Sequence, residues 1–245
     1  MTTPTAPTAP AERPPSVWED LLEIFYAPAA VFERRRDTPA FGLALIVLTV
    51  LFVASYFAFR GMTEAIFDVE FQRGMAQAMK QNPQLTEAQM LQGKEMAKKL
   101  IVVGVAFYAL VGPLLLGLCL WLVGKIAGSK AEISQTIMVA VYGMFPRVLE
   151  SVVNAGQMLF IPDEKITSRY SVTLGVGRFL DANTTNPLVM ALVGRIDVFT
   201  IWVTVLYAIG IKVVGRISWG NAALVGIIMW LIGALPGVWG ALRAM

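Results

Sequence analysis

The chain has 245 residues, of which 56% are hydrophobic and only 15% are charged. Soluble domains contain about 25% charged residues, so this composition indicates a protein that lies largely within a bilayer. The net charge of +3 is too small to indicate nucleic-acid binding, and the absence of histidine removes the commonest general base and metal ligand. The one cysteine, Cys119, lies in a hydrophobic run, so neither an internal disulfide nor a thiolate metal site is expected.

The first 39 residues divide into a tail and an amphipathic segment. Residues 1–15 include five prolines and few large apolar side chains, so we expect a disordered tail. Ser16 and Glu19 then form a capping-box pattern at the start of a helix. Residues 16–39 are therefore predicted to lie at the membrane interface as an amphipathic segment. Its apolar face would consist of Trp18, Leu21, Leu22 and Phe25, opposite Glu19, Asp20 and Glu23.

Five hydrophobic stretches follow, each long enough to cross a hydrocarbon core of about 30 Å. They cover residues 40–59, 100–123, 133–160, 196–214 and 219–242. The more polar residues 61–99 have helical periodicity, a stop at Asn82-Pro83 and a second capping box beginning at Thr86, which predicts an extramembrane helical hairpin between the first two spans. The predicted fold class is all-α: a polytopic transmembrane bundle of about five spans, formed by residues 40–245.

Charge near the ends of the spans favours one orientation. The cluster at Arg34 to Arg36 would share a side with the short connections, which hold Lys125, Lys130, Lys212 and Arg216. Basic residues in short loops mark the cytoplasmic side, so we predict a cytoplasmic N-terminus. The two long loops hold ten lysines and arginines on the other side, and we give the short loops more weight because their charges adjoin the spans.

Two polar stripes occur within the later spans. The residues after Pro146 that are spaced i, i+3, i+7 and i+10 share one helix face: Arg147, Glu150, Asn154 and Gln157. The fourth span carries a similar set: Asp197, Thr200, Thr204 and Tyr207. Because a charge at the bilayer centre costs about 2.5–3.5 kcal/mol on insertion scales, the stripes are expected to face each other, with an ion pair between Arg147 and Asp197.

The stripes allow more than one role. They could hold helices together near the membrane interface, or they could line a polar groove that binds a ligand or the helix of a partner. Glu150 and Asp197 could in principle act as paired carboxylates, but no histidine, activated serine motif or metal-ligand cluster accompanies them. We therefore predict no catalytic residue, no metal site and no cofactor.

Several short motifs give the chain a family resemblance. They are Pro28 followed by Val31-Phe32, the tyrosine and proline of Tyr142-Gly-Met-Phe-Pro146, the opening of the fourth span at residues 195–202, and the small residues 218–223. In this pattern the chain resembles the Yip1 family. It lacks the Asp-Leu-Tyr-Gly-Pro signature of the eukaryotic branch, which is associated with Rab-type GTPases, and so looks more like the bacterial branch. The resemblance implies five spans, a cytosolic N-terminus and no catalytic residues.

These observations lead to two functional hypotheses. The first is an integral inner-membrane protein that acts as a non-catalytic accessory or scaffold subunit of a membrane complex, whose partners are the bilayer and another membrane protein. Because some bacterial members appear alongside ABC-type exporters, the resemblance implies such an exporter as the partner and a role as a transport accessory. The alternative is a channel or carrier for a small polar or amphipathic solute, which would pass through the groove near Arg147 and Asp197.

Overall fold

The computed structural model describes residues 16–243, with only the backbone described at positions 80, 81, 87 and 163. The tail predicted for residues 1–15 lies outside this range. The regular elements of the described part are all helices, joined by turns and loops, and an isolated β-bridge links Gly175 and Asp197. The prediction of an all-α fold is therefore confirmed.

The predicted spans correspond to long apolar helices. They are α3 (Gly42–Ala58), α5 (Glu87–Ile126), α6 (Ile133–Gly143) with α7 (Phe145–Met158), α9 (Val198–Gly215) and α10 (Trp219–Arg243). Among the described residues, four helices are long and apolar enough to cross a membrane, or five if α3 is counted together with α4 (Arg60–Gln81) across a bend of 79°. The third predicted span is divided at Met144, two residues before Pro146, which occupies the first turn of α7.

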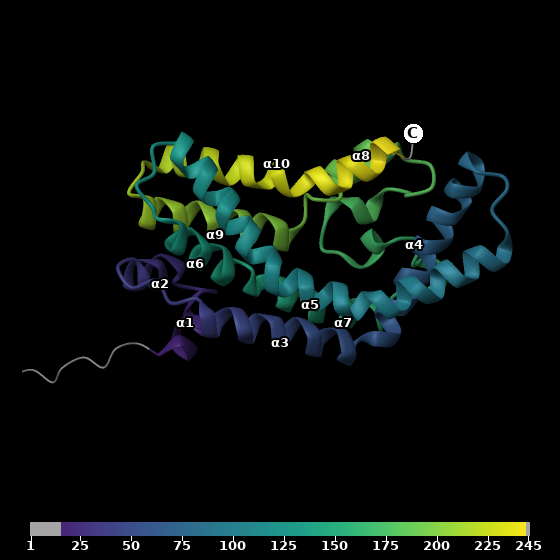
Figure 1. The fold of residues 1–245 in the computed structure, drawn as a ribbon, viewed down its shortest axis with the longest axis horizontal. Coiled ribbons are helices and arrows are strands. Elements are labelled where there is room, and N and C mark those ends of the chain that lie inside the picture. The colour runs from purple at the N-terminus through teal and green to yellow at the C-terminus, as the bar shows by residue number, and fades with distance from the viewer. Residues whose placement is uncertain (1–15, 244–245) are drawn as a thin grey trace, which may run out of the picture.

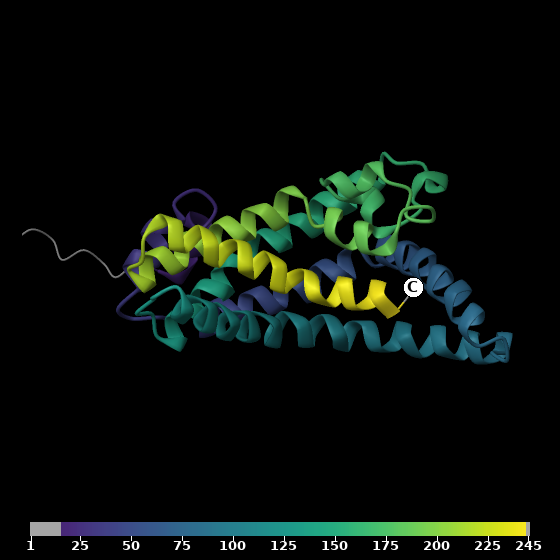
Figure 2. The ribbon, with the colours of Figure 1, turned by 90° about the horizontal axis from the view of Figure 1, so that it is seen from above.

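The helices run along the long axis of the molecule and define two ends (Figures 1 and 2). We call one the N-terminal end: it holds α1 (Val17–Glu23), α2 (Pro28–Arg35) and the two short connections between spans. Hydrogen bonds tie these connections together, from Asn221 Nδ2 to the Ala127 carbonyl at 3.0 Å and from the Lys130 amide to the Gly215 carbonyl at 3.1 Å. We call the other the hairpin end: it holds α4, the loop of residues 159–197 and α8 (Pro187–Val193).

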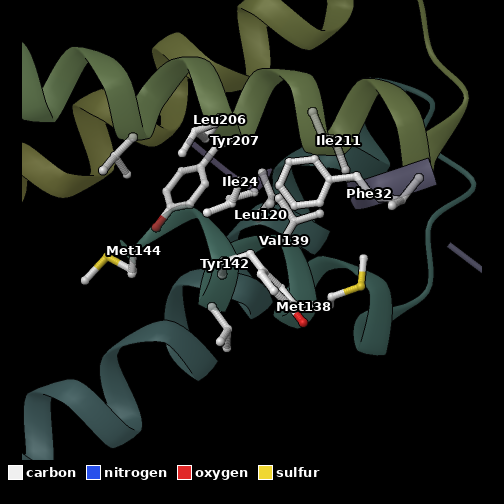
Figure 3. Close-up of a cluster of buried hydrophobic side chains, with 14 of the residues drawn as sticks. Ile24, Phe32, Leu120, Met138, Val139, Tyr142, Met144, Leu206, Tyr207 and Ile211 are labelled. Carbon is white, nitrogen blue, oxygen red and sulfur yellow. The ribbon is translucent and has the colours of Figure 1, made fainter. Parts of the chain in front are cut away.

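The N-terminal end contains a dense hydrophobic core. Side chains from α1, α2, α5, α6 and α9 meet there with almost no exposure, and Figure 3 shows them packed around Tyr142 of α6. They include Ile24, Phe32, Leu120, Met138, Val139, Leu206 and Ile211. Glycines let the helices approach closely: a Cβ added to Gly210 of α9 would overlap the side chain of Val139. Interiors packed this closely leave no path for a solute, so this half of the bundle contains no channel among the described residues.

The N-terminal segment differs from its prediction in one respect. The Ser16–Glu19 capping box is present, and Trp18 and Leu22 lie on the surface. Asp20, however, does not face water; its side chain is completely buried. The prediction was wrong because Arg34 and Arg35 of α2 fold back onto Asp20 and supply opposite charges, which allow the carboxylate to turn inward.

The predicted helical hairpin is present and docked. Asp68 of α4 lies 3.2 Å from the ammonium groups of both Lys94 and Lys98 in α5, which joins the two arms. Burial acts to raise the pKa of Asp68, but the hydrogen bonds and charges of the two lysines outweigh it, so the pKa lies below its usual value. The Arg169 amide donates to Glu70 Oε1 at 2.9 Å, which fastens α4 to the loop of residues 159–197.

Candidate functional site

The first polar stripe lies on α7, and its two charged members form an ion pair. Arg147 Nη1 donates to Glu150 Oε2 at 2.6 Å, one turn further along the same helix. Arg147 Nη2 donates to Thr200 Oγ1 at 2.9 Å, which joins α7 to α9. The prediction that the two stripes face each other is therefore correct at these positions.

The predicted ion pair between Arg147 and Asp197 is wrong. Asp197 is the N-cap of α9, and its Oδ1 accepts hydrogen bonds from the amides of Phe199 and Thr200, both at 3.0 Å. The first amides of a helix have no partner within the helix, so a capping carboxylate satisfies them and is stabilised by the helix dipole. Asp197 therefore accepts hydrogen bonds from backbone amides, and Arg147 forms its ion pair with Glu150 instead.

The remaining stripe residues have separate roles. Gln157 bonds the 159–197 loop, because its Nε2 donates to the Val172 carbonyl at 2.7 Å. The Thr204 hydroxyl donates to the carbonyl of Thr200 at 2.7 Å, within α9. Tyr207 is buried with its ring against Gly143, and its hydroxyl has no hydrogen-bond partner among the described residues. These three residues support the fold and do not line the cavity described next.

A cavity of about 620 Å³ lies at the hairpin end of the bundle, between α3, α7, α9, α8 and α10. Its size falls within the range usual for small-molecule sites, about 300–1,000 Å³. Five of the predicted site residues line it, namely Arg147, Glu150, Asn154, Asp197 and Thr200. Its other wall is apolar and includes Phe52, Tyr56, Phe59, Met62, Ile66 and Met158. The sequence therefore predicted much of the polar wall, and the structure adds the apolar one.

Sequence reasoning missed Arg195 as a site residue. Its guanidinium lies against Gly233 of α10, with Nη2 2.6 Å from where a Cβ would stand, and 5.6 Å from the centre of the Trp230 ring. Within the described part of the chain Arg195 forms no ion pair, and its buried Nε has no hydrogen-bond partner. Its position two residues before Asp197 could have indicated a site residue. Its contacts, however, come from α10, and the packing of α10 against this loop could not be predicted from the sequence.

Two further cavities adjoin the first. One lies toward the hairpin, shares Arg169, Tyr170 and Pro236 with the first cavity, and has a volume of about 880 Å³. The other, of about 300 Å³, shares Arg147 and Glu150 and is also lined by Tyr108 of α5. The three cavities share lining residues, and none of the buried core residues of the N-terminal end lines any of them.

The chemistry of this region suits binding. Among the side chains that the structure describes, no three Asp, Glu or Cys residues come together in a group that could hold a metal ion. The two carboxylates of the cavity are held by Arg147 and by the amides of α9. Such an arrangement presents arginine donors beside an apolar wall, which are the groups that recognise a ligand with a polar and an apolar part.

These features define a multi-pass α-helical membrane protein with a polar cavity between its spans. The chain belongs to the Yip1 domain family, whose pattern it matches over residues 22–240. This confirms the resemblance seen in the sequence motifs, and proteins of this family are generally non-catalytic membrane proteins. Comparisons with curated proteins and with solved structures gave no match.

Proposed function

We propose that this protein acts without catalysis, as an accessory or scaffold subunit that binds other components of a membrane complex. The observation that carries the proposal is the set of cavities at the hairpin end. Cavities that do not extend into the packed core support binding rather than passage, because a solute would have to cross the core around Tyr142.

Large apolar surfaces support the same proposal. Only 17% of the most apolar window of α5 and 28% of that of α10 are buried within the chain. Lipid can cover these surfaces, and so can the helices of a partner. Because the family's bacterial branch includes members found alongside ABC-type exporters, we propose such an exporter as the partner.

We also propose an orientation in the inner membrane. The structure brings Arg36, Lys125, Lys130, Lys212 and Arg216 to the N-terminal end, where the short connections lie. Basic side chains close to span ends favour the cytoplasmic side. In this proposal the N-terminus is cytoplasmic, and the hairpin and cavity mouth are on the opposite side.

Single-cysteine labelling tests the orientation. The chain has one cysteine, so Cys119→Ser provides a cysteine-free background. In that background, Asn183→Cys at the hairpin end should react with a membrane-impermeant maleimide in intact cells. Asp37→Cys at the N-terminal end is the matched control, because it is also exposed and should react only after lysis. The opposite pattern would reverse the proposed orientation.

Affinity purification tests the accessory role. The tagged protein is extracted in a mild detergent, and the retained proteins are identified by mass spectrometry. We expect one membrane partner in stoichiometric amount, and Trp18→Ala should weaken its retention if α1 contributes to the contact, because Trp18 is 60% exposed. Trp219→Ala is the matched control, an equally exposed tryptophan at the same end. Purification of the chain without any protein partner would count against the scaffold proposal.

A carrier is the second candidate function, and the polar lining of the cavity favours it. A carrier would move a polar or amphipathic solute into proteoliposomes, and the flux would depend on Arg147, whose guanidinium lines two of the cavities. A scaffold would show no flux in the same assay. Flux that disappears in Arg147→Gln, in a protein that remains folded, would therefore favour the carrier.

A further inference from the structure

We infer that the cavity binds a phospholipid with an anionic headgroup, with Arg195 as the headgroup contact. This inference rests on the proposed binding function of the same cavity and names the class of ligand. It follows from three features of the cavity: its charge balance, its unpartnered polar atoms and the distribution of its apolar side chains.

The charge balance of the cavity favours an anion. Three arginines line it (Arg147, Arg169 and Arg195), against the two carboxylates of Glu150 and Asp197. Arg147 and Glu150 neutralise each other, and the oxygen Oδ1 of Asp197 accepts from two amides of α9. No carboxylate lies within ion-pair distance of Arg195 among the described residues, and three arginines against two carboxylates leave the lining with an excess positive charge. A cation in a low-dielectric site attracts an anion strongly.

Two polar atoms at the cavity lack hydrogen-bond partners in the described structure. Arg195 Nε is a donor without an acceptor, and a phosphate oxygen is the acceptor that a guanidinium binds best. Asn154 Oδ1 is an acceptor without a donor. A headgroup that carries both a phosphate and a hydroxyl would satisfy both residues, and phosphatidylglycerol is a lipid of this type.

The apolar wall accounts for the rest of the ligand. Phe52 and Tyr56 of α3 are followed by Phe59 at the bend and by Met62 and Ile66 of α4, so this side of the cavity is mainly apolar, with Ser55 and Thr63 as its polar members. A free phosphate or sugar phosphate would leave this wall against water, whereas an acyl chain would cover it. The pairing of an unmatched cation with an apolar wall therefore indicates an amphiphile rather than a soluble anion.

Native mass spectrometry of the detergent-solubilised full chain tests the inference. The protein is titrated with the anionic lipid phosphatidylglycerol, with the zwitterionic lipid phosphatidylcholine, and with soluble glycerol 3-phosphate. We expect phosphatidylglycerol to bind at least about tenfold more tightly than phosphatidylcholine, and glycerol 3-phosphate not to displace it. Equal binding of the two lipids would overturn the inference, and displacement by glycerol 3-phosphate would show a site for soluble anions instead.

Variants separate Arg195 from general surface charge. Arg195→Gln should lose about tenfold in phosphatidylglycerol affinity, and Arg195→Lys should recover part of it because it restores the charge. Arg216→Gln is the matched control, since it removes an exposed arginine at the opposite end of the bundle. Equal losses in the Arg195 and Arg216 variants would refute the assignment, as would full affinity in Arg195→Gln.

The two proposals can fail separately. Retention of a protein partner by a chain that shows no lipid preference would leave the scaffold role and refute the lipid site. Preference for phosphatidylglycerol in a chain that purifies without a protein partner would support the lipid site and count against the scaffold role. A partner helix that occupies the cavity instead would appear as lipid binding that increases only after the partner is removed, and this outcome also counts against a resident lipid.

Discussion

The buried carboxylate of Asp20 allows a quantitative test of how the N-terminal segment is held. Its Oδ1 accepts from Arg34 and its Oδ2 from Arg35 Nε at 2.6 Å, so one carboxylate joins α1 to both arginines of α2. The same segment contacts the bundle, with the Phe25 ring 5.8 Å from that of Trp202 in α9. We therefore expect Asp20→Asn to lower the local stability of α1 and α2 without unfolding the spans.

The size of the effect follows from burial. Removing one member of a buried ion pair costs about 3–5 kcal/mol, because the remaining charge is left without a partner. Here the guanidinium side chains of Arg34 and Arg35 are 27% and 13% exposed, and Arg34 keeps Glu23 at 2.6 Å. Partial access to water and the second acid reduce the cost, so we expect about 2–3 kcal/mol for Asp20→Asn.

Hydrogen exchange in detergent measures this local stability. A loss of about 2–3 kcal/mol should speed exchange of the α1 and α2 amides about 30- to 150-fold, with little change in α9. Asp37→Asn is the matched control, because its ion pair with Arg36 is 3.4 Å long and the Asp37 side chain is 78% exposed. Such a surface pair contributes at most about 1 kcal/mol. If the two variants exchange alike, the buried carboxylate does not hold the segment.

Three further predictions concern the bundle and the hairpin. In a thermal unfolding assay, Gly143→Ala should lower the stability of the detergent-solubilised protein by about 1–3 kcal/mol, because the added Cβ would lie 2.5 Å from the Tyr207 ring of α9. Gly156→Ala is the matched control: its Cβ would meet open space, so this variant should be neutral or slightly stabilising. The pKa of Asp68 is lowered in the folded hairpin, so its contribution to stability is present above the unfolded pKa of about 3.9 and is lost as the pH falls through the lower folded value. Hydrogen exchange of the α4 amides should therefore become faster at low pH. Asp68→Asn should abolish this pH dependence. A double-mutant cycle between Arg147→Gln and Glu150→Gln should give a coupling energy of about 0.5–3 kcal/mol, and additive losses would refute the ion pair.

Local sequence patterns were sufficient to predict most of the fold. Capping boxes at Ser16 and Thr86 mark real helix starts, and the uncharged runs mark the spans. The spacing of Arg147 and Glu150 places both on one helical face, where they pair. Each of these features depends on residues close together in the chain, so periodicity and propensity alone could identify them.

Features that depend on distant elements could not be predicted. The burial of Asp20 requires α2 to fold back with two arginines, and the exposure of Arg195 to the cavity requires α10 to lie across α8 and α9. Asp197 is an intermediate case, because an aspartate just before an apolar run is also the signature of a helix N-cap. The ion pair with Arg147 was predicted from charge alone, but two unpaired backbone amides of the same helix were closer partners.

The break at Met144 explains why one span serves two roles. Before the break, α6 is buried from Met138 to Gly143, and the glycine admits the ring of Tyr207, so this half closes the bundle. After it, α7 buries mainly Phe145, Pro146 and Ala155 and turns its charged face to the cavity. Because the helix restarts at the proline, packing and binding residues occupy separate segments, and substitutions in α6 should alter stability whereas those on the polar face of α7 should alter ligand affinity.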